Sequence, residues 1–255
     1  MEEATSELLA FGEVAFFSTP SPDHPERNED AAVVVVRDNW SVLVVSDGAG
    51  GTSGGAQAAS MTTKILQQAL LQIEETVDVR PAVLDAIETA GTRIRETLSG
   101  ALATIAVVIL DSKSARSITV GDSICLVIGG RGKLKYRSIA HGPTGFAEEA
   151  GLLRAREAME HEERHLVSNM LGLEKMRIEL GVPVRLAVRD TVVVASDGLF
   201  DNVRVDEIAE RARIRPLGRA VDRLASLARD RMAGNGPHGH ADDLTIVAFR
   251  PASKR

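Results

Sequence analysis

Cysteine, aromatic side chains and long apolar runs are all scarce in this sequence of 255 residues. Its only cysteine, Cys125, excludes an internal disulfide and a cysteine-rich zinc site, which is typical of proteins from a reducing compartment. No stretch reaches the roughly 18 uninterrupted apolar residues of a membrane-spanning helix, and the acidic start Met1-Glu2-Glu3 lacks the basic region of a signal peptide. We therefore expect a cytoplasmic protein with no membrane partner.

Excess positive charge is absent as well. The net charge is -6 and aromatic residues make up 3% of the chain, whereas a broad nucleic-acid surface usually combines a basic face with stacking aromatic side chains. Nucleic acid is therefore not an expected partner, and divalent cations are a more natural one. The length suits one large domain or two small ones. We interpret residues 1–255 as a single domain and expect a monomer.

Short β-branched runs are the dominant pattern along the chain, and they predict buried strands. The runs lie at residues 33–36, 42–45, 104–110, 117–120, 124–128, 191–195 and 244–249. Two of the gaps, at 37–41 and 111–116, have room for hairpins but not for crossover helices. Neighbouring strands are therefore expected to pair antiparallel.

Helical spacing of apolar residues marks three other segments. They predict helices over about 61–73, 83–98 and 217–232, with Pro81 where the second can begin. Strands buried on both faces need cover, so we predict an α+β fold: two packed antiparallel β-sheets flanked by helices on both sides, an α-β-β-α sandwich. The charge-rich segment at about 141–180 is predicted to be a flap-like insertion with a helix around 148–161.

Aspartates mark the points where the predicted strands begin or end. Six of them share this placement or lie one helical turn from it: Asp30, Asp47, Asp122, Asp197, Asp201 and Asp242. In antiparallel neighbours the end of one strand lies beside the start of the next, so these carboxylates are expected to converge on one edge of the sheets. They would repel one another and raise one another's pKa values unless cations neutralise them. Hard oxygen ligands favour Mg²⁺, Mn²⁺ or Ca²⁺.

The Asp-Gly pairs also admit a simpler interpretation. Asp47-Gly48 and Asp197-Gly198 each follow an apolar strand, and Asp-Gly is a common turn dipeptide. Turns, however, do not require the same acid at every strand end. The whole set therefore favours a metal site over a series of unrelated turns.

Five motifs, in this order, resemble those of the type-2C family of metal-dependent serine/threonine protein phosphatases, which includes bacterial members. They are Asn28-Glu29-Asp30-Ala31, Asp47-Gly48-Ala49-Gly50-Gly51, Gly121-Asp122-Ser123, Asp197-Gly198-Leu199-Phe200-Asp201 and Asp242-Asp243-Leu244-Thr245. They span nearly the whole chain, and the ordered set is specific where one motif alone would not be. The resemblance implies a β-sandwich flanked by helices. It also implies an enzyme that acts on phosphoserine or phosphothreonine in proteins and opposes a serine/threonine kinase.

The resemblance further implies a catalytic centre in which a water bridging two Mg²⁺ or Mn²⁺ ions attacks the phosphoryl group. Asp47 would bridge the two ions, and Asp197 and Asp242 would complete the first ion site. Two cations about 3.5 to 4 Å apart lower the pKa of a shared water and stabilise charge on the phosphoryl group during in-line attack. These three aspartates are therefore the expected catalytic residues.

Two more ion sites follow from the same resemblance. The Gly48 carbonyl would serve the second ion, with Glu29 and Asp30 acting mainly through bound waters. Asp122 and Asp201 match the pair that holds a third ion in bacterial members. Two ions are therefore expected, and a third would need this additional pair.

The sequence departs from the family at the phosphate clamp. Pro25 stands where the family has an arginine that binds substrate phosphate, four residues before Glu29. Arg27 lies two residues further on and is the candidate for this role, although the preceding prolines disfavour a strand there. Ala49 stands where some members have a histidine that protonates the leaving group. A weaker clamp is expected to raise KM or narrow the substrate range, and the flap-like insertion is expected to select protein substrates.

Two other motifs compete with this interpretation. His161-Glu162-Glu163-Arg164-His165 fits the zinc-peptidase pattern, in which two histidines lie one helical turn apart with a glutamate as base. The surrounding charge favours a solvated helix instead. Cys125 and Arg131 have the spacing of cysteine-based phosphatases, but the residues after Cys125 continue a strand, which favours a buried structural thiol.

Two broader alternatives remain. Gly48-Ala49-Gly50 after a strand is similar to a dinucleotide-binding loop, although Asp47 would repel a pyrophosphate and the hairpin gaps oppose a parallel sheet. A degenerate phosphatase fold that only binds or regulates is the second alternative. The missing arginine favours it, and the presence of Asp47, Asp197 and Asp242 opposes it.

Overall fold

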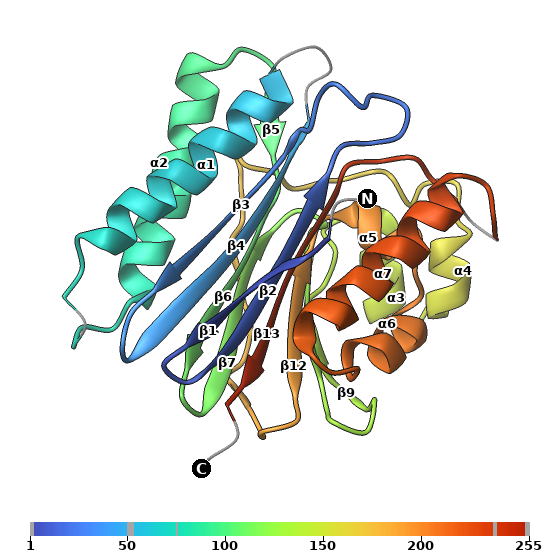
Figure 1. Ribbon diagram of the computed structural model, residues 1–255. Coiled ribbons are helices and arrows are strands. Elements are labelled where there is room, and N and C mark those ends of the chain that lie inside the picture. The colour runs from blue at the N-terminus through green and yellow to red at the C-terminus, as the bar shows by residue number, and fades with distance from the viewer. Residues whose placement is uncertain (1–2, 50–53, 75, 237–238, 253–255) are drawn as a thin grey trace.

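Two antiparallel β-sheets pack face to face in the computed structural model, and helices cover both outer faces (Figure 1). The structure describes residues 3–49, 54–74, 76–236 and 239–252. The strands are β1 (Thr5–Leu9), β2 (Gly12–Thr19), β3 (Asp30–Val36), β4 (Trp40–Ala49), β5 (Leu102–Ala103), β6 (Ile105–Asp111), β7 (Ser114–Val120), β8 (Ile124–Ile128), β9 (Leu134–Arg137), β10 (Glu179–Leu180), β11 (Val184–Arg185), β12 (Thr191–Ala195) and β13 (Leu244–Pro251). The helices are α1 (Gly54–Leu71), α2 (Arg80–Thr97), α3 (Pro143–Glu149), α4 (Ala155–Met159), α5 (Asp197–Phe200), α6 (Val205–Ala212) and α7 (Leu217–Met232).

The first sheet has the strand order β1-β2-β13-β12-β8-β9, and the second has the order β10-β7-β6-β4-β3. In the second sheet β11 also pairs with β7, and β5 pairs with β4. Short connections make β3 and β4, and likewise β6 and β7, antiparallel neighbours, as their gaps predict. The predicted α-β-β-α sandwich is therefore confirmed. No helix in the described ranges is both long and apolar enough to cross a bilayer.

The continuous apolar runs of the strands are explained by burial on both faces. Cys125 and Val127 of β8 lie in the core between the two sheets. The alternate residues Ile124, Leu126 and Ile128 lie in a second core, beneath α5, α6 and α7. Because successive side chains of a strand point to opposite faces, a strand that lies between two cores must be apolar at every position.

A third core lies between the second sheet and the helices α1 and α2. Leu66 and Leu70 of α1 and Ile87 and Ile94 of α2 are fully buried there against β4, β6 and β7. Their spacing of four and seven residues places each pair on one face of its helix. The predicted helices in these two segments and at α7 are confirmed, whereas the prediction omitted α6 and the strands β1, β2, β5, β9, β10 and β11.

The single helix predicted around 148–161 is wrong. The structure has two short helices, α3 and α4, with a turn between them. Gly151 ends the first one in the left-handed conformation (φ +71°), and its N–H donates to the Glu148 carbonyl at 3.0 Å. Glycine adopts this conformation without a steric penalty and therefore stops a helix whose side-chain pattern would otherwise continue.

The segment predicted as a flap-like insertion lies along one edge of the sandwich. Its later part adds β10 to the edge of β7. Leu171 exchanges backbone hydrogen bonds with Ala103, at 2.8 and 3.3 Å. The segment is thus held to the second sheet, while α3 and α4 lie near α5 and α6 (Figure 1).

Candidate metal centre

Asp30 and Asp47 are placed opposite each other by the register of β3 and β4. Asp30 opens one strand and Asp47 lies near the end of the other, so antiparallel pairing brings the two acids together. Thr104 holds the backbone at this point, since its N–H donates to the Asp47 carbonyl at 2.7 Å and its Oγ1 accepts the Asp47 N–H at 3.2 Å. Two carboxylates therefore lie at the edge of the second sheet.

Asp197, Asp201 and Asp242 are placed by the first sheet. β12 pairs with β13 so that Ala195 lies opposite Ile246. This register brings Asp197, which follows β12, close to Asp242, which precedes β13. Asp197 begins α5, and the Asp201 N–H donates to the Asp197 carbonyl at 2.7 Å. The spacing of four residues predicted that Asp201 lies one helical turn after Asp197, and the structure has this turn.

Asp122 enters the cluster through a sharp break between β7 and β8. Gly121, just before it, has a φ of +104°, and a Cβ at Gly121 would lie 2.6 Å from Cβ of Thr104. Only glycine meets both the conformational and the steric demand. The break turns Asp122 toward the acids of the other strands.

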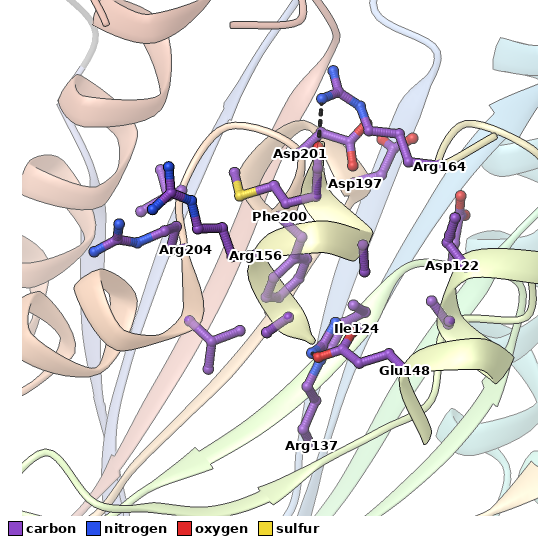
Figure 2. Close-up of a pocket in the computed structure, with 18 of the residues that line it drawn as sticks. Asp122, Ile124, Arg137, Glu148, Arg156, Arg164, Asp197, Phe200, Asp201 and Arg204 are labelled. Atoms are coloured by element: carbon purple, nitrogen blue, oxygen red, sulfur yellow. Dashed lines mark hydrogen bonds and ion pairs between the residues drawn. The ribbon is translucent and has the colours of Figure 1, made fainter. Parts of the chain in front are cut away.

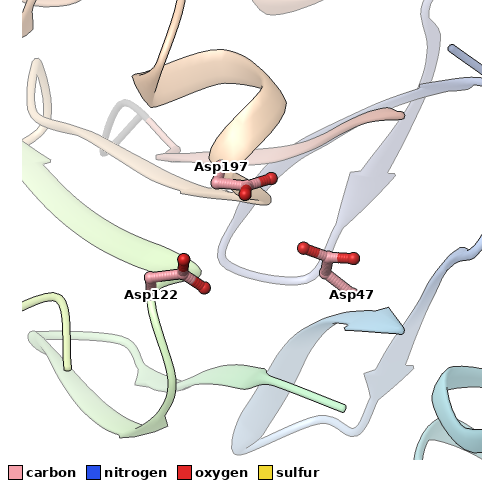
Figure 3. Close-up of side chains that lie close together, drawn as sticks. All are labelled: Asp47, Asp122 and Asp197. Carbon is pink, nitrogen blue, oxygen red and sulfur yellow. The ribbon is translucent and has the colours of Figure 1, made fainter. Parts of the chain in front are cut away.

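The side chains of Asp47, Asp122 and Asp197 point toward a common space from three different elements (Figure 3). Each offers one carboxylate oxygen, and these three oxygens lie within 4.8 Å of one another. The Oδ1 atoms of Asp30, Asp122 and Asp197 are buried without a hydrogen-bond partner among the described residues. Buried acceptors without partners are costly, so the donor set fits a divalent cation that oxygen ligands coordinate.

The electrostatic cost of this arrangement appears in the pKa values. Burial, followed by the charges of the other acids, raises the pKa values of Asp47 and Asp197 well above their usual range. Burial also raises the pKa of Asp30 and that of Asp122 to about 7, and the charge of Asp201 adds to the effect at Asp122. Cation binding must therefore displace protons from this cluster near neutral pH.

Several positioning residues around the acids were missed by the sequence prediction. The Ser196 hydroxyl donates to Asp30 Oδ2 at 2.7 Å, which leaves Oδ1 for the centre. The buried Asp243 carboxylate accepts the N–H groups of Ser21 at 2.7 Å and Glu29 at 2.6 Å, and so holds the loop that carries Glu29. The only sequence signal for Asp243 was its place beside Asp242 in an acidic pair.

A buried histidine connects the flap-like segment to the Asp122 loop. His141 Nδ1 accepts the Gly121 N–H at 3.0 Å and lies 2.8 Å from the Asn169 amide nitrogen. Since Nδ1 is an acceptor, the ring proton is on Nε2, which faces Glu179 Oε2 at 3.1 Å. The break at Gly121 is therefore fixed partly by residues of the segment predicted to be an insertion, and no sequence pattern marked them.

Three other candidate residues lie at the rim of the cluster. Arg27 is on the loop between β2 and β3 rather than in a strand, and its guanidinium group forms an ion pair with Glu29. Gly48 packs against the start of α1, where a Cβ would lie 2.0 Å from the Gly55 carbonyl oxygen. Gly50 and Gly51 of the same motif lie outside the described residues.

The competing motifs lack the geometry that their chemistry needs. His161 and His165 lie in a turn after α4, not on a helix, and His161 Nδ1 accepts the Glu163 N–H at 3.1 Å. The two histidines therefore do not have the helical spacing of the zinc-peptidase pattern. Cys125 is buried in the middle of the sandwich, where burial raises the pKa of its thiol, so it is a core residue and not a nucleophile.

A pocket of about 380 Å³ opens beside the carboxylates (Figure 2). Asp122, Asp197 and Asp201 line one end, and β8, β9, α3, α4, α5 and the start of α6 supply most of the rest of the wall. The wall is largely apolar, with Phe200 among its side chains. Arg164 reaches from the flap-like segment to Asp201, with Nε 3.5 Å from Oδ2. The pocket thus continues from the acidic centre to the space between α3, α4, α5 and the start of α6.

A two-sheet sandwich with helices on both faces and a carboxylate centre at one edge defines the class of metal-dependent phosphatases. Residues 24–233 match the family model described as protein phosphatase 2C, and the chain belongs to this family.

Known proteins with similar sequences and structures agree. The serine/threonine phosphatase stp of Listeria monocytogenes is 25% identical over 232 residues, which cover 86% of this chain and 88% of that protein. The structure of the serine/threonine phosphatase Stp1 from Staphylococcus aureus has a TM-score of 0.82 at 24% identity, with 100% of each chain covered. The catalytic domain of the phosphatase PstP in complex with two manganese ions has a TM-score of 0.76 at 20% identity, covering 98% of this chain and 100% of that one. These structures share the fold of this chain.

Replacing Gly198 with alanine is expected to loosen the centre and destabilise the protein. A Cβ there would lie 2.0 Å from the Asp243 carbonyl oxygen, a backbone atom that cannot move without shifting the start of β13. Overpacking of this kind costs about 1–3 kcal/mol of unfolding free energy. Chemical denaturation and Mn²⁺ titration calorimetry should both show a loss. Gly218→Ala is the matched control, because the nearest atom to its Cβ is Ser6 Oγ at 3.7 Å. Equal stability of the two variants would contradict the prediction.

Proposed function

We propose that this chain hydrolyses phosphoserine and phosphothreonine in proteins, with Mg²⁺ or Mn²⁺ ions held by the aspartate cluster. The observation that carries the proposal is the convergence of Asp47, Asp122 and Asp197, whose oxygens lie within 4.8 Å of one another. Membership of the phosphatase family supports it, and so does the fold shared with a phosphatase domain that binds two manganese ions. We further propose that the chain acts as a monomer and opposes a serine/threonine kinase, which must supply its substrate.

The ion sites that we propose use the residues at the sheet edge. Asp47 would contact two ions, with Asp197 and Asp242 on the first ion. The Gly48 carbonyl would serve the second ion, and Glu29 and Asp30 would act through water. A third ion would require Asp122 and Asp201, which both line the pocket beside the centre.

Bound divalent cations supply Lewis-acid polarisation of the phosphoryl oxygens and lower the pKa of a coordinated water. The chain's own contribution is to keep the carboxylates close together and aimed at one point. The hydrogen bond from Ser196 fixes one Asp30 oxygen and leaves the other buried without a hydrogen-bond partner among the described residues. Asp243 anchors the backbone of Glu29 in the same way. Because these contacts exist before substrate binds, little reorganisation is needed when charge develops on the phosphoryl group.

Purified protein is expected to release phosphate from phosphoserine and phosphothreonine peptides only when Mn²⁺ or Mg²⁺ is present. Removing the ions should lower turnover by at least about 100-fold, because their electrostatic stabilisation of the transition state is lost. Phosphate release is measured on a peptide panel before metal removal, after it, and after Mn²⁺ is returned. A matched phosphotyrosine peptide serves as the control for residue type.

Two outcomes would contradict the proposed function. Mn²⁺ binding in calorimetry without turnover of any phosphopeptide would make the chain a binding module with a phosphatase fold. Full turnover after exhaustive metal removal would show that the aspartates do not act through cations.

Arg27→Ala is expected to raise KM for a phosphopeptide about tenfold, with a smaller change in kcat. We propose that Arg27 contacts the substrate phosphate, and a charge-assisted hydrogen bond of this kind is worth about 1.5–3 kcal/mol. Steady-state kinetics on one phosphothreonine peptide measures the effect. Arg93→Ala, on the exposed face of α2, is the control. An unchanged KM would show that Arg27, which forms an ion pair with Glu29, does not contact the substrate phosphate.

A further inference from the structure

A separate, polar pocket of about 440 Å³ lies at the end of the first sheet that is opposite the aspartates. Its lining consists of Gly130, Val188, Arg189, Arg213, Arg215 and Arg250. The strands β12 and β13 connect the two sites, since β13 begins just after Asp242 and reaches Arg250 near its other end. The six-residue step from Leu244 to Arg250 corresponds to about 20 Å of extended strand. The arginine pocket is therefore separate from the metal centre.

Arg250 forms the inner wall of this pocket. The residue is only 6% exposed, yet its guanidinium group has no carboxylate partner within the described residues. Its Nη2 donates to the Ala212 carbonyl at 2.5 Å and the Ile214 carbonyl at 3.0 Å, and its Nε donates to Thr191 Oγ1 at 3.2 Å. Buried charges in proteins are normally paired. A buried guanidinium group that has no ion pair therefore favours an anion from outside the chain.

The contacts of Arg250 also organise the pocket. The two carbonyl groups that it binds belong to Ala212 and Ile214, and so flank Arg213 and directly precede Arg215. Burial and the nearby charge of Arg215 lower the pKa of Arg250, while Glu13 across the strand pair opposes this effect. These hydrogen bonds thus hold the loop between α6 and α7 so that Arg213 and Arg215 lie beside Arg250.

The remaining arginines present unneutralised charge to the pocket. Arg189, Arg213 and Arg215 are exposed, and within the part of the chain that the structure describes none of them forms a hydrogen bond or an ion pair through its side chain. No acidic residue is among the lining residues. Asp190, the nearest acid in the sequence, is buried and forms an ion pair with Lys135. The pocket therefore concentrates four positive charges, and no acidic side chain among the described residues lines it, although Glu13, across the strand pair from Arg250, acts on Arg250 from outside the lining.

We propose that this pocket binds a phosphate-bearing anion, separately from the catalytic centre. Guanidinium groups offer planar pairs of N–H donors that match phosphate oxygens, and they stay charged at any physiological pH. Four of them around one pocket suit a multiply charged group such as pyrophosphate better than a single carboxylate. The same chemistry is present in free pyrophosphate, in a nucleoside diphosphate and in a phosphorylated side chain.

Binding of sodium pyrophosphate to metal-free protein is the direct test. Divalent ions are stripped with a chelator, which is then removed by desalting, because without cations the aspartate cluster repels phosphate and cannot account for binding. Titration calorimetry at low salt is expected to show one site on the full chain. R213A/R215A should weaken binding by at least about tenfold, whereas R219A, an exposed arginine on α7, should leave it unchanged. Both substituted arginines of the double variant are exposed, so the fold is expected to persist.

The outcomes separate this proposal from the proposed function, since no turnover is measured. No binding by the metal-free wild type, or equal binding by R213A/R215A, overturns the proposal. Citrate binding as tight as pyrophosphate binding also overturns it, because the site would then recognise charge alone. Parallel titrations with inorganic phosphate, a nucleoside diphosphate and a phosphoserine peptide identify the source of the anion. The compound that binds most tightly indicates the class of molecule that carries the anion.

Discussion

Asp47→Asn is expected to abolish metal-dependent turnover and, at the same time, to raise the thermal stability of the metal-free protein. Asp47 is surrounded by other acids, since Asp30, Asp122, Asp242 and Asp243 all raise its pKa after burial itself. At neutral pH the unfolded chain ionises this aspartate freely, whereas the folded chain resists its charge. Asparagine keeps the shape and removes that penalty, so the folded state of the metal-free protein is favoured.

The activity loss has a different cause. Without its charge, residue 47 is a poor ligand for a divalent cation, and kcat/KM is expected to fall by at least about 10³-fold. Phosphopeptide kinetics and differential scanning calorimetry on stripped protein measure the two effects. Asp85→Asn on the exposed face of α2 is the control and should change neither. Retained activity would overturn the assignment of Asp47 to the ions, and a lowered melting temperature would overturn the electrostatic account.

The second large effect concerns pH. The metal-free protein is expected to become less stable as pH rises from 5 to 8. Asp30 and Asp122 have pKa values of about 7 in the folded state, while an unfolded aspartate has a pKa of about 3.9. Between these values the unfolded state loses protons that the folded state retains, so rising pH favours unfolding. The loss begins near pH 4 and continues to about pH 7 for these two residues.

Mn²⁺ or Mg²⁺ should reverse this trend. A ligand that binds only the folded state at 100 times its Kd stabilises it by about 2.7 kcal/mol, which corresponds to a rise in Tm of about 5–10 °C for a chain of this size. Because the ions displace protons, the rise should be larger at pH 7.5 than at pH 5. Scanning calorimetry across this pH range, with and without Mn²⁺, measures it. An equal metal effect in an Asp47→Asn/Asp197→Asn variant would place the ions elsewhere.

Local patterns predicted the elements that lie wholly inside the fold. The runs that became β4, β6, β8, β12 and β13 are apolar at nearly every position because each has a core on both sides. Short gaps allowed only hairpins, and so the antiparallel pairing that brings Asp30 opposite Asp47 could be predicted as well. By contrast, the helix predicted around 148–161 was wrong, because one residue, Gly151, ends α3 within a pattern that otherwise suits a helix.

The positioning residues could not be predicted, because their roles depend on partners far away in the sequence. Asp243 acts through backbone groups of Ser21 and Glu29, more than 200 residues earlier. His141 acts through Gly121 and Asn169, on either side of it in the chain. No spacing rule connects such residues. The four arginines of the distal pocket come from three separate segments, at Arg189, at Arg213 and Arg215, and at Arg250, and carried no sequence signal at all.

The sequence by itself determined the class of fold and the family, because apolar periodicity and acids at strand ends are local features that each segment carries independently. The tertiary structure alone decided how close the acids lie, which of their oxygens remain unpaired, and which buried arginine of the distal pocket has no ion pair among the described residues. Those properties arise from packing and desolvation, which exist only once distant segments have excluded water from one another.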